Sequence, residues 1–160
     1  CLACNLGTGM RKDCSMAKKR QGDPWMPAPD FGRSLEGLSI NLLVSDVAAA
    51  VDFAQTVLGA DAVYADPDFA VMRHGTTQWM LHADHTYENH PLAGFVKGVE
   101  GRGAGVEIRL HRSDPDGAES RARAAGQTIL AGAVDKPHGL REAYILDPDG
   151  YCWVIDRPVS

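Results

Sequence analysis

The sequence predicts an α+β fold made of two βαβββ modules. One observation is an internal repeat: each half of the chain has a strand-like segment, then a Ser-Asp pair, then a helical segment that ends at a glycine. The two helical segments match in length, since Asp46 lies 13 positions before Gly59 and Asp114 lies 12 before Gly126. A second observation is the stretch 142–156, where two runs rich in strand-forming residues flank the turn sequence Asp-Pro-Asp-Gly.

The composition is that of a globular protein. With 160 residues, 44% hydrophobic and 23% charged, the chain suits one domain or two small fused modules. The net charge of −5 and the lack of a basic patch argue against a general nucleic-acid binder. No apolar run approaches the ~18 residues that cross a membrane, so no membrane partner is expected. Residues 1–22 lack the apolar core of a signal peptide, so no signal peptide is expected.

Three of the four cysteines lie at the start of the chain. Cys1 and Cys4 form a Cys-x-x-Cys pair near Cys14, whereas Cys152 stands alone in the last strand-like run. A zinc site needs a fourth ligand at matching spacing, so a loosely packed extension is the favoured interpretation. Cys152 is expected to be a small buried side chain in a protein of a reducing compartment.

Residues 1–36 are predicted to be an N-terminal extension that is partly disordered or forms an arm. The segment lacks hydrophobic periodicity, and its prolines favour an extended backbone because each restricts itself and the residue before it. Three large apolar side chains are expected to anchor this arm on the body of the protein or on a second subunit. They are Trp25, Met26 and Phe31.

Residues 37–84 are predicted to form the first module. Its first strand is expected at 38–44, and Ser45 or Asp46 caps the helix that follows. Three short strands complete the module, at about 62–65, 69–73 and 78–83.

A linker loop is predicted at 85–103 and the second module at 104–160. A loop of about 20 residues is long for a compact domain, which indicates a linker or a functional segment. The second module repeats the order of the first. We expect a strand at 106–111, a helix that Ser113-Asp114 caps and that ends at Gly126, and strands at 127–130, 143–146 and 151–155.

Three segments resemble the vicinal oxygen chelate superfamily, which includes glyoxalase I, bleomycin-resistance proteins and extradiol dioxygenases. They are Ile40-Asn41-Leu42-Leu43-Val44-Ser45-Asp46, Val57-Leu58-Gly59, and Gly139-Leu140-Arg141-Glu142 leading into Asp147-Pro148-Asp149-Gly150. The resemblance covers roughly residues 37–157. It implies two βαβββ modules whose mixed sheets curl around a shared cavity.

The resemblance also locates the positions at which metal-dependent members hold a divalent cation. Those members use four ligands, one from the first and one from the fourth strand of each module. The matching positions here are Ser39, Met80, Glu107 and Val154. Only Glu107 is a good ligand for such a cation, because Ser, Met and Val bind hard or borderline metals poorly. We therefore expect neither the usual divalent metal nor another cofactor.

Polar side chains are expected on the cavity faces of the strands. The predicted ligand-binding residues are Asn41, His82, Glu107, Arg109 and His111, with Asp156 as a further candidate. Three interpretations stay open: an internal ion network, a site for a polar or anionic small molecule, and a rearranged metal site. The metal site would use His82 and Glu107, with His85 as a possible addition.

The favoured function is that of a glyoxalase/bleomycin-resistance-like small-molecule-binding protein without the usual metal site. One alternative is a metal-dependent lyase, isomerase or dioxygenase with displaced ligands. Another is a degenerate structural member. Whether the protein is an enzyme stays open, as does the identity of its ligand. The resemblance further implies a homodimer, and the composition a cytoplasmic location without nucleic-acid or membrane partners.

Overall fold

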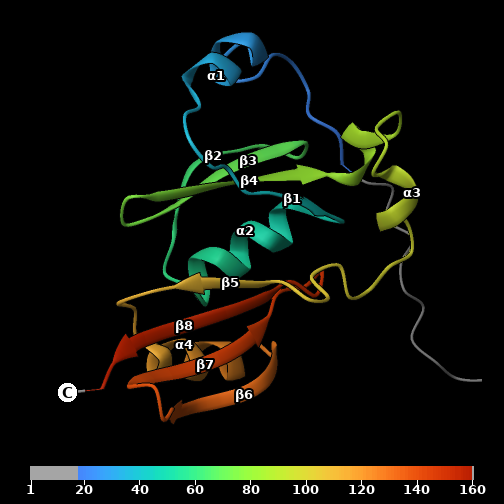
Figure 1. Ribbon diagram of the computed structural model, residues 1–160. Helices are drawn as coiled ribbons and strands as arrows, with labels where there is room; N and C mark the ends of the chain where they lie inside the picture. The colour runs from blue at the N-terminus through green and yellow to red at the C-terminus, as the bar shows by residue number, and fades with distance from the viewer. Residues whose placement is uncertain (1–17, 160) are drawn as a thin grey trace, which may run out of the picture.

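The computed structural model describes residues 18–159, which form two four-stranded sheets with one main helix packed on each (Figure 1). The strand orders are β1-β4-β3-β2 and β5-β8-β7-β6. In each sheet the first and last strands of the module pair in parallel, and the other neighbours pair antiparallel. The predicted α+β fold with two βαβββ modules and mixed sheets is confirmed, and neither sheet closes into a barrel.

The elements follow one another in the order that the sequence predicts. The first module contains β1 (Asn41–Val44), α2 (Val47–Thr56), β2 (Asp61–Ala65), β3 (Phe69–His74) and β4 (Thr77–Ala83). The second contains β5 (Glu107–Leu110), α4 (Pro115–Ala124), β6 (Thr128–Asp135), β7 (Leu140–Leu146) and β8 (Cys152–Pro158). Between the modules lie a 3-10 turn, η1 (Asp84–Tyr87), and a short helix, α3 (Ala93–Val96).

The two main helices begin differently. The Asp46 side chain accepts hydrogen bonds from the backbone N–H groups of Ala48 and Ala49, as an N-cap should. Asp114 occupies the equivalent position of α4, but its side chain makes no capping bond, so that part of the prediction is wrong. Pro115 follows directly and has no N–H, which leaves α4 one fewer donor to satisfy.

Strand β6 is longer than the sequence predicts. It continues to Asp135 instead of ending at residue 130. Its register with β7 shifts twice, between Ile129 and Ala131 and between Ala131 and Val134. Such irregularities break the alternation by which strands are recognised in a sequence.

The helix-bearing faces of the two sheets share one core. Helix α2 packs on β2, β3 and β4, and α4 packs on β6, β7 and β8. Trp79 of the first sheet meets Trp153 of the second with ring centroids 5.1 Å apart. In Figure 1, α2 lies between the first sheet and β5, while α1 lies beyond the opposite face of that sheet. The helix-free faces of the two sheets therefore do not face each other within one chain.

A polar clasp also joins the modules. The Arg102 guanidinium donates to both carboxylate oxygens of Asp84, at 2.6 and 2.8 Å, and to the Leu43 carbonyl at 3.0 Å. Asp149 in the β7–β8 turn lies 3.6 Å from the same guanidinium and accepts a bond from the Ser45 N–H at 2.9 Å. The turn sequence Asp-Pro-Asp-Gly thus docks the second module on the end of β1.

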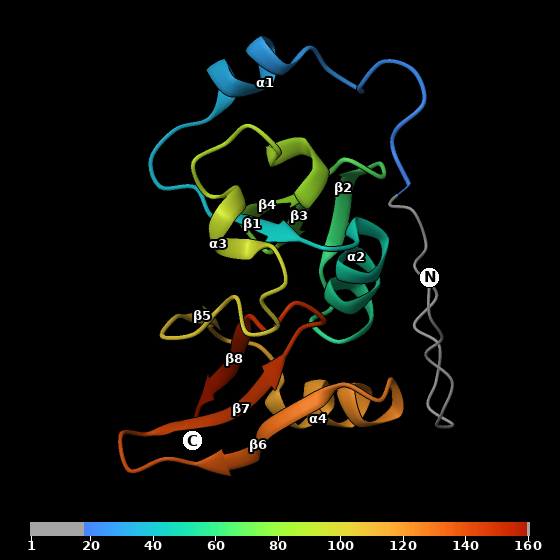
Figure 2. The ribbon, with the colours of Figure 1, turned by 90° about the vertical axis from the view of Figure 1, so that its right-hand side faces the viewer.

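The N-terminal arm crosses the helix-free face of the first sheet. Its helix α1 (Ala28–Ser34) stands apart from the body and is joined to it by extended segments (Figure 2). The expectation that the prolines keep the backbone extended is wrong for residues 28–34, because Pro29 occupies the first helical turn, where proline is tolerated. The anchoring prediction is confirmed for two side chains: Trp25 stacks on Tyr64, and Phe31 packs edge-on against Phe69. Cys1, Cys4 and Cys14 lie outside the described residues.

None of the helices within residues 18–159 has the length and hydropathy needed to cross a membrane.

Candidate functional site

A pocket of about 380 Å³ lies between the arm and the helix-free face of the first sheet. Aromatic and aliphatic side chains from both sides form most of its wall. The lining residues are Arg20, Pro24, Trp25, Met26, Ala28, Phe31, Gly32, Leu35, Asp68, Phe69, Met80, His82 and Thr86. This pocket combines an apolar enclosure with few polar groups, as small-molecule sites commonly do.

His82 is the central polar side chain of this pocket. Alternation along β4 puts it on the same face as Met80. Its Nδ1 lies 2.6 Å from Asn41 Oδ1, and Asn41 Nδ2 donates to the Tyr87 hydroxyl at 2.6 Å. Because the Asn41 amide nitrogen is used by Tyr87, its oxygen accepts from His82 Nδ1–H. This assignment leaves a lone pair on His82 Nε2, which has no hydrogen-bond partner within residues 18–159.

Burial lowers the pKa of His82, so the imidazole is neutral at pH 7. A neutral ring with Nδ1 protonated can accept a hydrogen bond or a proton at Nε2. Its surroundings are aromatic: the centroid of the His82 ring lies 4.6 Å from that of Phe69 and 5.4 Å from that of Tyr87. The site can therefore hold a flat molecule and take a hydrogen bond from it.

The charged groups of this pocket are already paired. Asp68 accepts from the Arg20 backbone N–H at 2.8 Å and from His85 Nε2 at 2.9 Å. The Arg20 guanidinium donates to Asp66 at 3.1 Å. The Thr86 hydroxyl donates a hydrogen bond to the Ala83 carbonyl. His82 Nε2 is thus available to a ligand, as is Asp68 Oδ2, because both bonds to Asp68 fall on Oδ1.

The helix-free face of the second sheet carries an ion network centred on Arg109. The guanidinium contacts Glu107 at 3.0 Å, Asp156 at 3.1 Å, and Glu142. The last two carboxylates lie opposite each other on β8 and β7, and both are buried. One cation therefore serves three anions.

Two histidines complete the network from outside. His111 Nδ1 lies 2.9 Å from Asp156, and His138 Nε2 lies 2.9 Å from Glu142, which also accepts from the Tyr144 hydroxyl at 2.6 Å. Burial alone would raise the pKa of Glu142, but the bonds from Tyr144, His138 and Arg109 together lower it to about 2. Glu142 is therefore ionised, and each of the two buried carboxylates has more than one hydrogen-bonding partner.

The five predicted ligand-binding residues fall into two groups. Asn41 and His82 are hydrogen-bonded on the first sheet, and Glu107, Arg109 and His111 lie on the second. No hydrogen bond or ion pair joins the two groups, although all five residues are described. Within one chain the structure does not bring them together.

Sequence reasoning missed several residues of both sites. Glu142 and Tyr144 could have been found from the sequence, since strand alternation puts them on one face of β7. His138 precedes β7 in a turn, where alternation has no meaning. Trp25 and Phe31 were expected to be anchors, and nothing local in the sequence indicates that they also line a pocket.

The positions that hold metal in the resembling families do not suit a divalent cation here. Met80 and Val154 offer no hard donor, and Ser39 offers only a hydroxyl group. Glu107 is bound by the positively charged Arg109, which would repel a cation. Within residues 18–159, no group of three or more His, Cys, Asp or Glu residues is placed to hold a metal ion.

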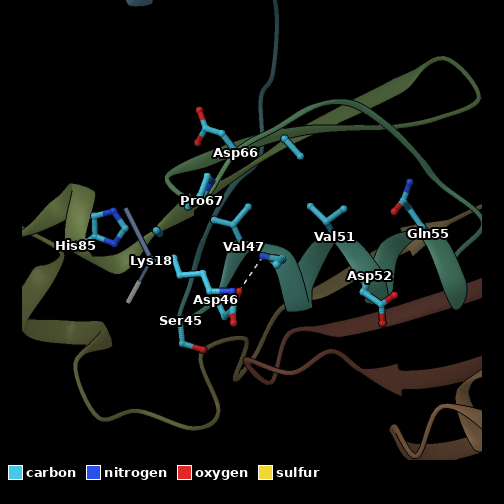
Figure 3. Close-up of a pocket in the computed structure, with 13 residues that line it drawn as sticks. Lys18, Ser45, Asp46, Val47, Val51, Asp52, Gln55, Asp66, Pro67 and His85 are labelled. Atoms are coloured by element: carbon cyan, nitrogen blue, oxygen red, sulfur yellow. Dashed lines mark hydrogen bonds between the residues drawn. The ribbon is translucent and has the colours of Figure 1, made fainter. Parts of the chain in front are cut away.

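A larger pocket, of about 590 Å³, runs along α2 (Figure 3). Val47 and Val51 form part of its wall, with Asp46 and Asp66 beside them. Those two carboxylates are occupied, since Asp46 caps α2 and Asp66 binds Arg20 and Tyr64. Lys18, Ser45, Asp52 and Gln55 add further polar groups to its wall, so this pocket differs from the one that contains His82 chiefly in lacking Phe, Tyr and Trp side chains.

Comparisons with known proteins agree with the fold. A model of the Glyoxalase/Bleomycin resistance protein/Dioxygenase superfamily matches residues 38–155. A search of curated proteins found no match. The solved structures that match include a glyoxalase/bleomycin resistance protein/dioxygenase family enzyme from Burkholderia phytofirmans PsJN. That enzyme shares 21% identity at a TM-score of 0.63, over 76% of this chain and 97% of its own.

Two further structures have similar coverage. Virulence protein STM3117 from Salmonella typhimurium shares 26% identity at a TM-score of 0.56, over 78% of this chain and 98% of its own. TioX from Micromonospora sp. ML1 shares 24% identity at a TM-score of 0.56, again over 78% and 98%. The family match covers most of the chain and both modules, and the fold agrees. The chain belongs to the Glyoxalase/Bleomycin resistance protein/Dioxygenase superfamily.

Proposed function

We propose that this protein binds a small molecule without a metal ion, and that the pocket between the arm and the first sheet is its binding site. The observation that carries the proposal is His82, a neutral imidazole whose Nε2 is free in an aromatic-lined pocket. Asn41 orients this imidazole and fixes its tautomer. A pocket of about 380 Å³ also favours binding over a purely structural role.

Tryptophan fluorescence tests this site directly. Trp25 lines the pocket and is 45% exposed, whereas Trp79 and Trp153 are 3% and 2% exposed. We expect 4-nitroaniline, a flat neutral quencher, to reduce the emission saturably in the native protein. Trp25→Phe is expected to remove that quenching. Phe95→Ala, which alters an exposed aromatic residue outside this pocket, is expected to leave it unchanged. Quenching that does not saturate, or that survives in Trp25→Phe, would contradict the proposal.

Metal content separates this proposal from a metal-dependent lyase, isomerase or dioxygenase. That alternative needs His82 and Glu107 as displaced ligands, and they lie on different sheets. We expect protein purified from metal-supplemented medium to contain well under one divalent ion per chain by elemental analysis. We also expect EDTA to leave its Tm unchanged. One tightly bound ion per chain, lost in both His82→Ala and Glu107→Ala, would favour the enzyme instead.

We further propose a homodimer. A cavity lined by both groups of predicted residues requires a second copy, because the helix-free faces of one chain do not face each other (Figure 1). Exposed Leu38 and Val106 support an interface, since such side chains gain from burial. Light scattering coupled to size exclusion should give twice the chain mass, and a monomer at micromolar concentration would contradict it.

We assign the protein to the cytoplasm, on the support of the free thiol of Cys152. Fractionation of the source cells tests this location, and recovery of the protein outside the cytoplasmic fraction would refute it.

A further inference from the structure

We infer that residues 18–37 are a ligand-selecting segment, and that the pocket beneath them takes an uncharged aromatic molecule with a hydrogen-bond donor. The inference rests on the proposed function and goes beyond it. It concerns a part of the chain that the superfamily model does not match, since the match begins at residue 38.

The arm supplies one wall of the pocket. Trp25, Phe31 and Leu35 come from the arm, and Phe69 and His82 come from the first sheet. The rest of the superfamily domain therefore does not enclose this space alone. A ligand held against His82 would touch side chains from both walls.

The arm is fixed in place but is not packed flat on the sheet. Arg20 bonds to Asp66, and the Trp25 ring stacks on Tyr64 at 5.1 Å with the planes 14° apart. Yet no residue of α1 is buried. A helix held over a sheet by its flanks, with the pocket below it, is arranged to cover a ligand.

The pocket is built for a molecule without charge. The Arg20 guanidinium is paired with Asp66, Asp68 accepts from the Arg20 backbone N–H and His85, and His82 is neutral. An anion in this pocket would lose water and lie beside the Asp68 carboxylate, which is unfavourable. The wall formed by Trp25, Phe31 and Phe69 suits an aromatic ring, because aromatic pairs gain beyond simple area burial.

His82 also determines which hydrogen-bonding group a ligand needs. His82 Nε2 has a lone pair and no proton, because Nδ1–H is donated to Asn41. It can accept a hydrogen bond but cannot give one. A ligand that brings a donor satisfies this nitrogen, and one without a donor leaves it unpaired.

Calorimetric titration with three probes of matched shape tests the inference. The probes are 4-nitroaniline, which is neutral with a donor, N,N-dimethyl-4-nitroaniline, which has no donor, and 4-nitrobenzoate, which is an anion. For the native protein we expect the dimethyl probe to bind about fivefold more weakly than 4-nitroaniline, and the anion to bind weakest. In His82→Phe the two neutral probes should bind equally.

The variants Trp25→Ala and Phe31→Ala test the role of the arm. Each is expected to weaken the binding of 4-nitroaniline about tenfold. Neither residue is buried, so the fold should persist, which circular dichroism checks. Phe95→Ala serves as the control and should bind like the native protein.

The outcomes separate the two proposals. If all three probes bound equally and Trp25→Ala abolished that binding, the proposed binding site would stand but the inferred ligand class would be overturned. Binding of 4-nitroaniline that neither arm variant weakens would overturn the role of the arm. No heat of binding with any probe, together with no Trp25 quenching, would overturn the proposed function and this inference with it.

Discussion

Replacing Arg102 with Met is expected to lower the free energy of unfolding by about 3–5 kcal/mol. The Arg102 side chain is 5% exposed and binds Asp84 through two parallel hydrogen bonds. It also donates to the Leu43 carbonyl and lies beside the buried Asp149. Met retains the apolar stem but leaves these groups without their cation. Because they come from both modules, the docking of one module on the other should weaken.

Urea denaturation measures this effect, and two variants calibrate it. Arg102→Lys keeps the charge but cannot form the bidentate hydrogen bonds with Asp84, so an intermediate loss of unfolding free energy is expected. Arg73→Met breaks an exposed ion pair with Asp61 and should change stability by less than about 1 kcal/mol. A loss in Arg102→Met no larger than in Arg73→Met would show that the clasp does not hold the modules together.

Replacing Arg109 with Met is expected to cost about 3 kcal/mol, near the lower end for a broken buried ion pair. The lower end applies because the Arg109 side chain is 27% exposed, so water can partly replace it. Glu142 and Asp156 would then be buried carboxylates without their shared cation. Urea denaturation at pH 7 measures the loss, and a change below about 1 kcal/mol would contradict it.

The pH dependence identifies the cause of that loss. The pKa of Glu142 is about 2 in the folded protein, against its ordinary value of 4.5. Because the folded value is lower, the unfolded chain binds more protons between these values, and stability falls as the pH falls. The contribution is full above pH 4.5 and is lost towards pH 2. Without Arg109 the pKa should rise, so the acid-dependent loss should shrink. An unchanged slope between pH 5 and pH 3 would mean that packing, and not charge, explains the variant.

Local patterns were sufficient for most of the fold. The Ser-Asp pairs, the closing glycines and the turn at 147–150 each act over a few residues, and they located both modules. Local patterns failed where a distant segment decides the conformation. The bulges of β6 interrupt its alternation, yet Glu119 of α4 binds the Ala133 N–H beside them and holds the strand.

The sequence likewise predicted one part of the candidate site and not the other. Alternation along one strand put His82 on the same face as Met80, and Glu107 on the same face as Arg109, because side-chain direction in a strand has a period of two. Alternation does not determine what lies opposite that face.

The sequence by itself therefore determined the family, the two modules and the face on which each polar residue stands. The turn at 147–150 and Val154 after it already indicated the superfamily and a poor position for a metal ligand. Only the tertiary structure decided that Glu107 and Arg109 belong to an ion network, and that His82 is covered by Trp25 and Phe31. These decisions depend on contacts between segments far apart in the chain, which no local periodicity encodes.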